Sequence, residues 1–188
     1  MTAQRDIGLA LGKATSIYDT LPVCLDAAIT ATEADSGGIY IFDTLSGDLN
    51  LACSRGLSGR FINRVNRYAG DSDRVKLVMM NNPIYLEKID KYAAYHDDDI
   101  IEESLRSLAV IPIGNNDTIF GSMHIASHVS DWIPENFRDA LESIANQIGT
   151  SMARIHAEEA MRESENKFRN LAENAMVGIY LIEDKLLR

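Results

Sequence analysis

Residues 105–127 constrain the fold more than any other part of this chain. Two runs rich in valine and isoleucine flank the sequence Gly-Asn-Asn-Asp at residues 114–117, where every residue favours turns. Apolar runs on either side of such a cluster are typical of a β-hairpin, so we predict two antiparallel strands here. Neither strand has a plainly solvent-like face, which predicts that the hairpin lies in the middle of a sheet with both faces covered.

The second strand of this hairpin carries the most informative pattern for function. Side chains alternate between the two faces of a strand, which predicts one face with isoleucine, methionine and glycine and another with a small polar group. The first face holds Ile119, Gly121, Met123 and Ile125, and the second holds Phe120, Ser122, His124 and Ala126. Helices would cover the first face. The second face, with its serine and histidine, is the candidate border of a ligand cavity.

The chain before the hairpin predicts helices and then a second hairpin. Apolar residues at helical spacing indicate a helix from Ile7 to about Tyr18 and another over residues 21–32. Residues 39–42 and 49–54 are strand-like, with turn formers between them. The less regular residues 55–105 would form an excursion between strands of one sheet, and such long excursions are typical of a cap or lid.

A long helix is predicted after Pro134. Its apolar residues recur at steps of three and four, close to the spacing of a coiled-coil seam. These residues are Leu141, Ile144, Ile148, Met152 and Ile155. We therefore expect a homodimer through this helix. The predicted domains are residues 1–152, a charged linker or coiled-coil helix over residues 153–171, and residues 172–188, where residues 175–182 have a strand pattern and begin a further domain.

Composition limits the partners. The chain of 188 residues has 18 basic and 28 acidic residues, and its net charge is −10. Such a charge disfavours nucleic acid and anionic membranes as partners. The apolar runs are shorter than the ~20 residues of a membrane helix, and no signal peptide is visible, which predicts a cytoplasmic protein. Cys24 and Cys53 would then be free thiols.

The order of these elements resembles that of a GAF domain. The local sequences that carry the resemblance are Ala-Asp-Ser-Gly-Gly-Ile-Tyr-Ile at 34–41, Arg-Gly-Leu-Ser at 55–58, Pro-Ile-Tyr-Leu at 83–86, Arg-Ser-Leu-Ala-Val-Ile-Pro-Ile at 106–113 and Gly-Ser-Met-His-Ile-Ala-Ser at 121–127. The resemblance implies an α/β (α+β) fold: an antiparallel central sheet, helices on one face, and a ligand pocket under a cap on the other.

Residues 163–179 look like the start of a PAS domain. A GAF-to-PAS order joined by a helix is similar to that of archaeal and bacterial sensor histidine kinases of two-component systems. The resemblance implies that this segment senses a small molecule, a cofactor or a redox state and relays it along a dimeric exit helix. The segment would not itself be an enzyme, although its parent would be a histidine kinase.

Two residues are candidates for holding a cofactor. His124 could ligate haem iron or bond another small ligand, and the alternative is a core histidine whose nitrogens are satisfied internally. Cys53 could supply a thiolate to haem or a tetrapyrrole, and the alternative is an ordinary buried thiol. We predict no other metal site, and no Ser-His-Asp set, nucleotide-binding glycine loop or HExxH motif occurs in the sequence.

Two other functions remain open. The first is a GAF dimerisation module that binds no ligand. The second is an enzyme of the methionine-sulfoxide reductase kind, because some free-standing GAF proteins reduce that substrate; it would need a resolving cysteine near an active one.

Overall fold

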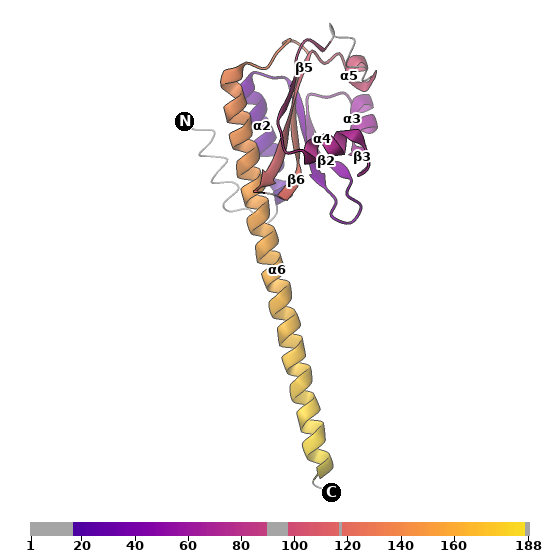
Figure 1. Cartoon of the computed structure of the whole chain (residues 1–188), viewed down its shortest axis with the longest axis vertical. Coiled ribbons are helices and arrows are strands. Elements are labelled where there is room, and N and C mark those ends of the chain that lie inside the picture. The colour runs from indigo at the N-terminus through magenta and orange to yellow at the C-terminus, as the bar shows by residue number, and fades with distance from the viewer. Residues whose placement is uncertain (1–16, 90–97, 117, 187–188) are drawn as a thin grey trace. The chain divides into compact units, whose positions relative to one another are not determined.

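The computed structural model of the protein describes residues 17–89, 98–116 and 118–186, with their side chains up to residue 172. The chain divides into two compact units after Met152. The first unit contains a six-stranded antiparallel sheet in the order β3-β2-β1-β6-β5-β4 (Figure 1). The strands are β1 (Ser36–Phe42), β2 (Leu49–Arg55), β3 (Arg67–Tyr68), β4 (Ile84–Leu86), β5 (Ser107–Asn115) and β6 (Thr118–Ser127).

The predicted central hairpin is confirmed as β5 and β6. β6 lies between β1 and β5, so its ladder is paired on both sides. The earlier hairpin is also present as β1 and β2. The mixed α/β architecture with an antiparallel sheet and a long C-terminal helix is therefore as expected.

Within the described residues, six helical segments accompany the sheet. They are η1 (Ile17–Asp19), α2 (Leu21–Thr32), α3 (Gly59–Val65), α4 (Asp73–Met79), α5 (Asp98–Glu102) and α6 (Glu135–Leu186). Pro22 lies in the first turn of α2, where a missing N–H has no structural cost. The helix predicted from Ile7 falls mostly outside the described residues, and its last part is the 3₁₀ turn η1.

The helices form two layers in the first unit (Figure 1). Helix α2 and residues 135–152 of α6 cover one face of the sheet, and α3, α4 and α5 lie on the other side as a cap. The covered face of the sheet is fully buried at Ile39, Met123 and Ile125, and Leu25 of α2 is fully buried as well. One contact between α6 and β5 is very close, because a Cβ added at Gly149 would lie 2.0 Å from the carbonyl oxygen of Gly114.

Packing on the sheet accounts for most of the apolar stripe of α6. Leu141, Ile144, Ile148 and Met152 are exposed by 0, 2, 0 and 3% within a single chain. Only Ile155 of the five predicted seam residues is half-exposed. The expectation that all five form an intermolecular seam is thus corrected. Helical periodicity shows that a face is apolar, but it does not show whether the partner is the protein's own sheet or a second chain.

The strand pattern at residues 175–182 is not realised. Helix α6 continues to Leu186. A short apolar run fits a helix as well as a strand, and no neighbouring strand is present in the described chain to pair with it. No helix among the described residues is both long and apolar enough to cross a membrane.

Candidate ligand-binding site

A cavity of about 380 Å³ lies between the sheet and the cap. This volume is within the range of ligand pockets in proteins. Its walls come mainly from β1, β4, β5 and β6 on the sheet side and from α3, α4 and α5 on the cap side. The residues that carry the argument below are Tyr40, Phe61, Tyr68, Arg74, His124 and Ala126.

Aromatic and cationic side chains gather at one part of this cavity. The ring of Tyr40 lies 4.5 Å from that of His124 and 5.4 Å from that of Tyr68, measured between centroids. The guanidinium carbon of Arg74 lies 4.8 Å from the centroid of Tyr68, and Arg74 Nη1 donates to the Tyr68 hydroxyl at 3.0 Å. The cavity therefore has hydroxyl, imidazole and guanidinium groups on an otherwise apolar wall.

His124 borders the cavity, as predicted. Its Nε2 is 2.9 Å from the hydroxyl of Ser122, which is fully buried two residues earlier on the same face of β6. Burial and, as the smaller cause, the positive charge of Arg74 together lower the pKa of His124 to about 3. The imidazole is accordingly neutral at physiological pH. Ala126 lines the same wall, whereas Ser122 is not among the described lining residues and meets the site only through its bond with His124.

Two β-bulges place the other two candidate site residues, Cys53 and Phe120, away from the cavity wall. In β2, Ile39 pairs with Cys53 whereas Tyr40 pairs with Leu51, so Ala52 is an extra residue. Residues directly opposite each other point to the same face, and Cys53 therefore lies with Ile39 on the helix-covered face. Cys53 is not among the described residues that line the cavity.

The second bulge is in β6, where Phe120 is the extra residue between the pairs Ile113–Gly121 and Gly114–Ile119. Ile119 consequently packs with the cluster around Tyr40 on the cavity side. Phe120 is absent from the described cavity wall. Ile119 thus lies on the opposite face from the one predicted, because one inserted residue inverts the alternation, and Phe120 does not line the cavity as expected.

Haem and tetrapyrrole groups fit these residues poorly. Iron ligation through Nε2 of His124 would break its bond with Ser122, and Cys53 does not reach the wall. Burial also raises the pKa of Cys53, which disfavours its thiolate. No group of three or more His, Cys, Asp and Glu side chains in the described part of the chain is placed to hold a metal ion.

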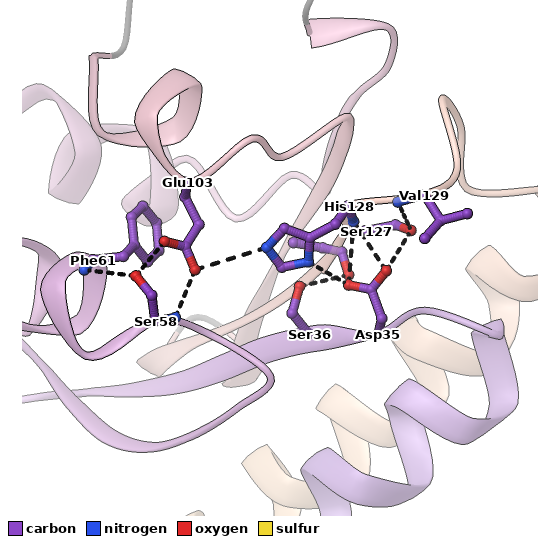
Figure 2. Close-up of polar contacts among 9 residues, drawn as sticks. Asp35, Ser36, Ser58, Phe61, Glu103, Ser127, His128 and Val129 are labelled. Atoms are coloured by element: carbon purple, nitrogen blue, oxygen red, sulfur yellow. Dashed lines mark hydrogen bonds and ion pairs between the residues drawn. The ribbon is translucent and has the colours of Figure 1, made fainter.

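A chain of polar contacts ties the cap to the sheet (Figure 2). Asp35, which precedes β1, accepts from the backbone N–H of His128 and lies 2.7 Å from its Nδ1. His128 Nε2 lies 3.7 Å from Glu103, which follows α5. Glu103 in turn accepts from the backbone N–H of Ser58 at 2.6 Å and from its hydroxyl.

This chain of contacts also organises the start of α3. The Ser58 hydroxyl caps α3 by accepting from the N–H of Phe61, and Phe61 lines the cavity. Burial tends to raise the pKa of Asp35, but the hydrogen bonds from His128 and Ser36 outweigh it and lower that pKa. The start of β1, the end of β6, the end of α5 and the capped start of α3 are therefore linked.

Sequence reasoning missed Tyr40, Tyr68 and Arg74. Alternation along β1 could have found Tyr40, because it shares a face with Gly38, which also lines the cavity. Arg74 lies on the short helix α4 in the irregular region, where no periodicity indicates which residues meet the sheet. Only the tertiary structure brings it to His124.

The fold and site together define an α/β domain with a capped cavity. The comparisons agree: a model of the GAF domain family matches residues 14–153. The chain therefore belongs to the GAF family. No curated protein matches it.

Solved structures share the fold at low identity. A domain of a protein described as a two-component sensor histidine kinase from Sinorhizobium meliloti 1021 is 24% identical, with a TM-score of 0.64 over 78% of this chain and 97% of that one. The GAF domain of a phosphoenolpyruvate-protein phosphotransferase from Coxiella burnetii is 21% identical, with a TM-score of 0.68 over 84% and 95%. The chromophore-binding domain of a bacteriophytochrome from R. palustris is 11% identical, with a TM-score of 0.68 over 84% and 61%.

Proposed function

We propose that this chain is the sensory input domain of a cytoplasmic signal-transduction protein, such as a histidine kinase, and that a small molecule in the cavity is its signal. The observation that carries the proposal is the cavity itself, with its capped apolar wall and cluster of hydrogen-bonding groups. Strand β6 would transmit a change at the ligand in the cavity to the exit helix, α6. His124 faces the cavity, whereas Met123 and Ile125 are buried on the face that α6 covers.

The proposal predicts that filling the cavity abolishes ligand binding. Ala126 is 2% exposed and lines the cavity, so Ala126→Phe would occupy ligand space. Ala52→Phe is the matched control, because Ala52 is exposed on the bulge of β2. The protein is incubated with a small-molecule extract, desalted and examined by mass spectrometry and thermal unfolding. A ligand at ~100 times its Kd stabilises by about 2.7 kcal/mol.

We expect uptake and stabilisation in the wild type and in Ala52→Phe but not in Ala126→Phe. Equal uptake by Ala126→Phe would contradict the cavity as the site. A wild type that takes up nothing would favour the module that binds no ligand.

The enzyme alternative finds little support in the thiols. Burial, and then the proximity of Cys53, raises the pKa of Cys24 to about 11. Burial also raises the pKa of Cys53. Since the thiolate is the nucleophile, both cysteines are poorly reactive at neutral pH, and neither is among the described residues of the cavity wall.

We further propose that the chain dimerises through a different part of α6 than the five residues predicted from its periodicity. Met161, Phe168 and Leu171 are exposed by 67, 75 and 69%. With Ala157 and Ser164 they recur at steps of four, three, four and three, which is the spacing of a coiled-coil seam. We take residues 153–171 as the dimeric linker and residues 172–188 as the start of a PAS domain, on the strength of the sequence resemblance at residues 163–179.

This second proposal predicts that Phe168→Glu yields a monomer. The substitution places a charge in the seam, where its desolvation opposes association. Asn170→Glu is the matched control, since it adds the same charge at an exposed position two residues away, on the opposite side of the helix. Sedimentation velocity should show a dimer for the wild type and for Asn170→Glu. A dimer that persists in Phe168→Glu would place the interface elsewhere.

A further inference from the structure

The cavity is polar at one end and apolar at the other. Its apolar end belongs to the buried cluster of Ile100, Leu105, Leu108 and Ala126, with Leu57, Phe61 and Leu86 packed against it. Its polar end belongs to a second cluster that contains Tyr40 and Tyr68. Arg74 and His124 lie against these two tyrosines. Val110 packs against both clusters and so marks the boundary between the two ends.

The polar end contains a guanidinium group. Arg74 is the one lysine, arginine, aspartate or glutamate among the described residues of the wall. His124 is neutral, so it neither adds to nor offsets this charge. A guanidinium can only donate hydrogen bonds, and its planar fork matches a carboxylate. The described wall therefore favours an anionic head group over a cationic one.

Hydroxyl donors stand beside this charge. Burial raises the pKa of Tyr40, and its contact with Tyr68 raises it further, so its phenol keeps its proton. Buried carboxylates need several donors, because their desolvation is costly unless hydrogen bonds replace water. The two tyrosines and the arginine can together supply them.

We propose that the cavity selects a small carboxylate with an apolar body, whose carboxylate lies against Arg74, Tyr68 and Tyr40 and whose body lies among the apolar cluster near Ala126. This inference rests on the proposed ligand-sensing function and narrows it to a chemical class.

Three probes with one body and different head groups test the class: 4-phenylbutyrate, 4-phenylbutanol and 4-phenylbutylamine. Calorimetric titration of the 188-residue chain should give the tightest binding for the carboxylate, on the order of tenfold over the alcohol, and no binding for the amine. Arg74→Gln should reduce the affinity for 4-phenylbutyrate to that for 4-phenylbutanol and leave the affinity for the alcohol unchanged. Circular dichroism checks that the variant is folded.

Lys76→Gln is the matched control for Arg74→Gln. It removes the same charge from the same helix, but Lys76 is exposed and pairs with Asp73. This control should bind all three probes as the wild type does.

The outcomes separate the ligand class from the function. Equal binding of carboxylate and alcohol, or an Arg74→Gln variant with unchanged affinity for the carboxylate, would overturn the class and leave the cavity as a binding site. Failure of all three probes at millimolar concentration would also overturn the class. The Ala126→Phe experiment then decides the proposed function independently.

Discussion

Gly149→Ala is expected to lower the free energy of unfolding by at least about 2 kcal/mol, in the range of overpacked cores. The added Cβ would lie 2.0 Å from the carbonyl oxygen and 2.5 Å from the carbonyl carbon of Gly114. Both atoms belong to the backbone of β5, so no side chain can rotate away. Helix α6 would have to lift from the sheet, and this cost exceeds the roughly 1 kcal/mol by which alanine favours a helix over glycine.

Gly59→Ala is the matched control for this substitution. Gly59 is also helical, at the start of α3, and an added Cβ there meets nothing within 4 Å. We expect this variant to be as stable as the wild type or more stable by up to about 1 kcal/mol. Urea unfolding followed by circular dichroism measures both. If both variants kept the wild-type stability, α6 would not pack on β5 at Gly114.

The sequence predicted the parts of the site that depend on local periodicity. Between Gly121 and Ser127 the alternation of β6 is uninterrupted, and His124, Ser122 and Ala126 were therefore assigned to the correct face. The assignment failed at Phe120, and the candidate Cys53 lies away from the cavity, because each lies at or just beyond a β-bulge. A bulge inserts one residue and reverses every face beyond it, and neither bulge has a glycine or proline at the inserted position to reveal it.

Longer-range features could not be predicted in the same way. The apolar stripe of α6 was real, but its partner is set by tertiary packing: residues 141–152 meet the protein's own sheet. Arg74 reaches the cavity because α4 folds back over β6, and no spacing in the sequence encodes that approach. The cap contacts of Asp35, His128 and Glu103 likewise join residues that are far apart in the chain.

His124 is expected to make the folded protein sensitive to mild acid. Its pKa is lowered from 6.5 to about 3 in the folded state, so between these values the unfolded chain binds the additional proton. The stabilising contribution is complete above pH 6.5 and is lost as the pH falls towards 3. The free energy of unfolding changes by about 1.4 kcal/mol per pH unit in this range, because the unfolded state binds one proton more than the folded state. Unfolding by urea between pH 7.5 and 5.0 measures this pH dependence of the free energy of unfolding, above the range in which most carboxylates titrate.

Two replacements separate this titration from packing. His124→Gln retains a group that can bond to Ser122, and His124→Phe retains a ring that can stack on Tyr40. Their stabilities at pH 7.5 should differ from each other and from the wild type, since each loses a different contact. Neither replacement side chain titrates, however. Below pH 6.5 the free energy of unfolding of both variants should therefore fall less steeply with decreasing pH than that of the wild type, by about 1.4 kcal/mol per pH unit. An unchanged slope in both would mean that His124 accepts a proton in the folded state, and a neutral imidazole could then no longer be assigned to the cavity wall.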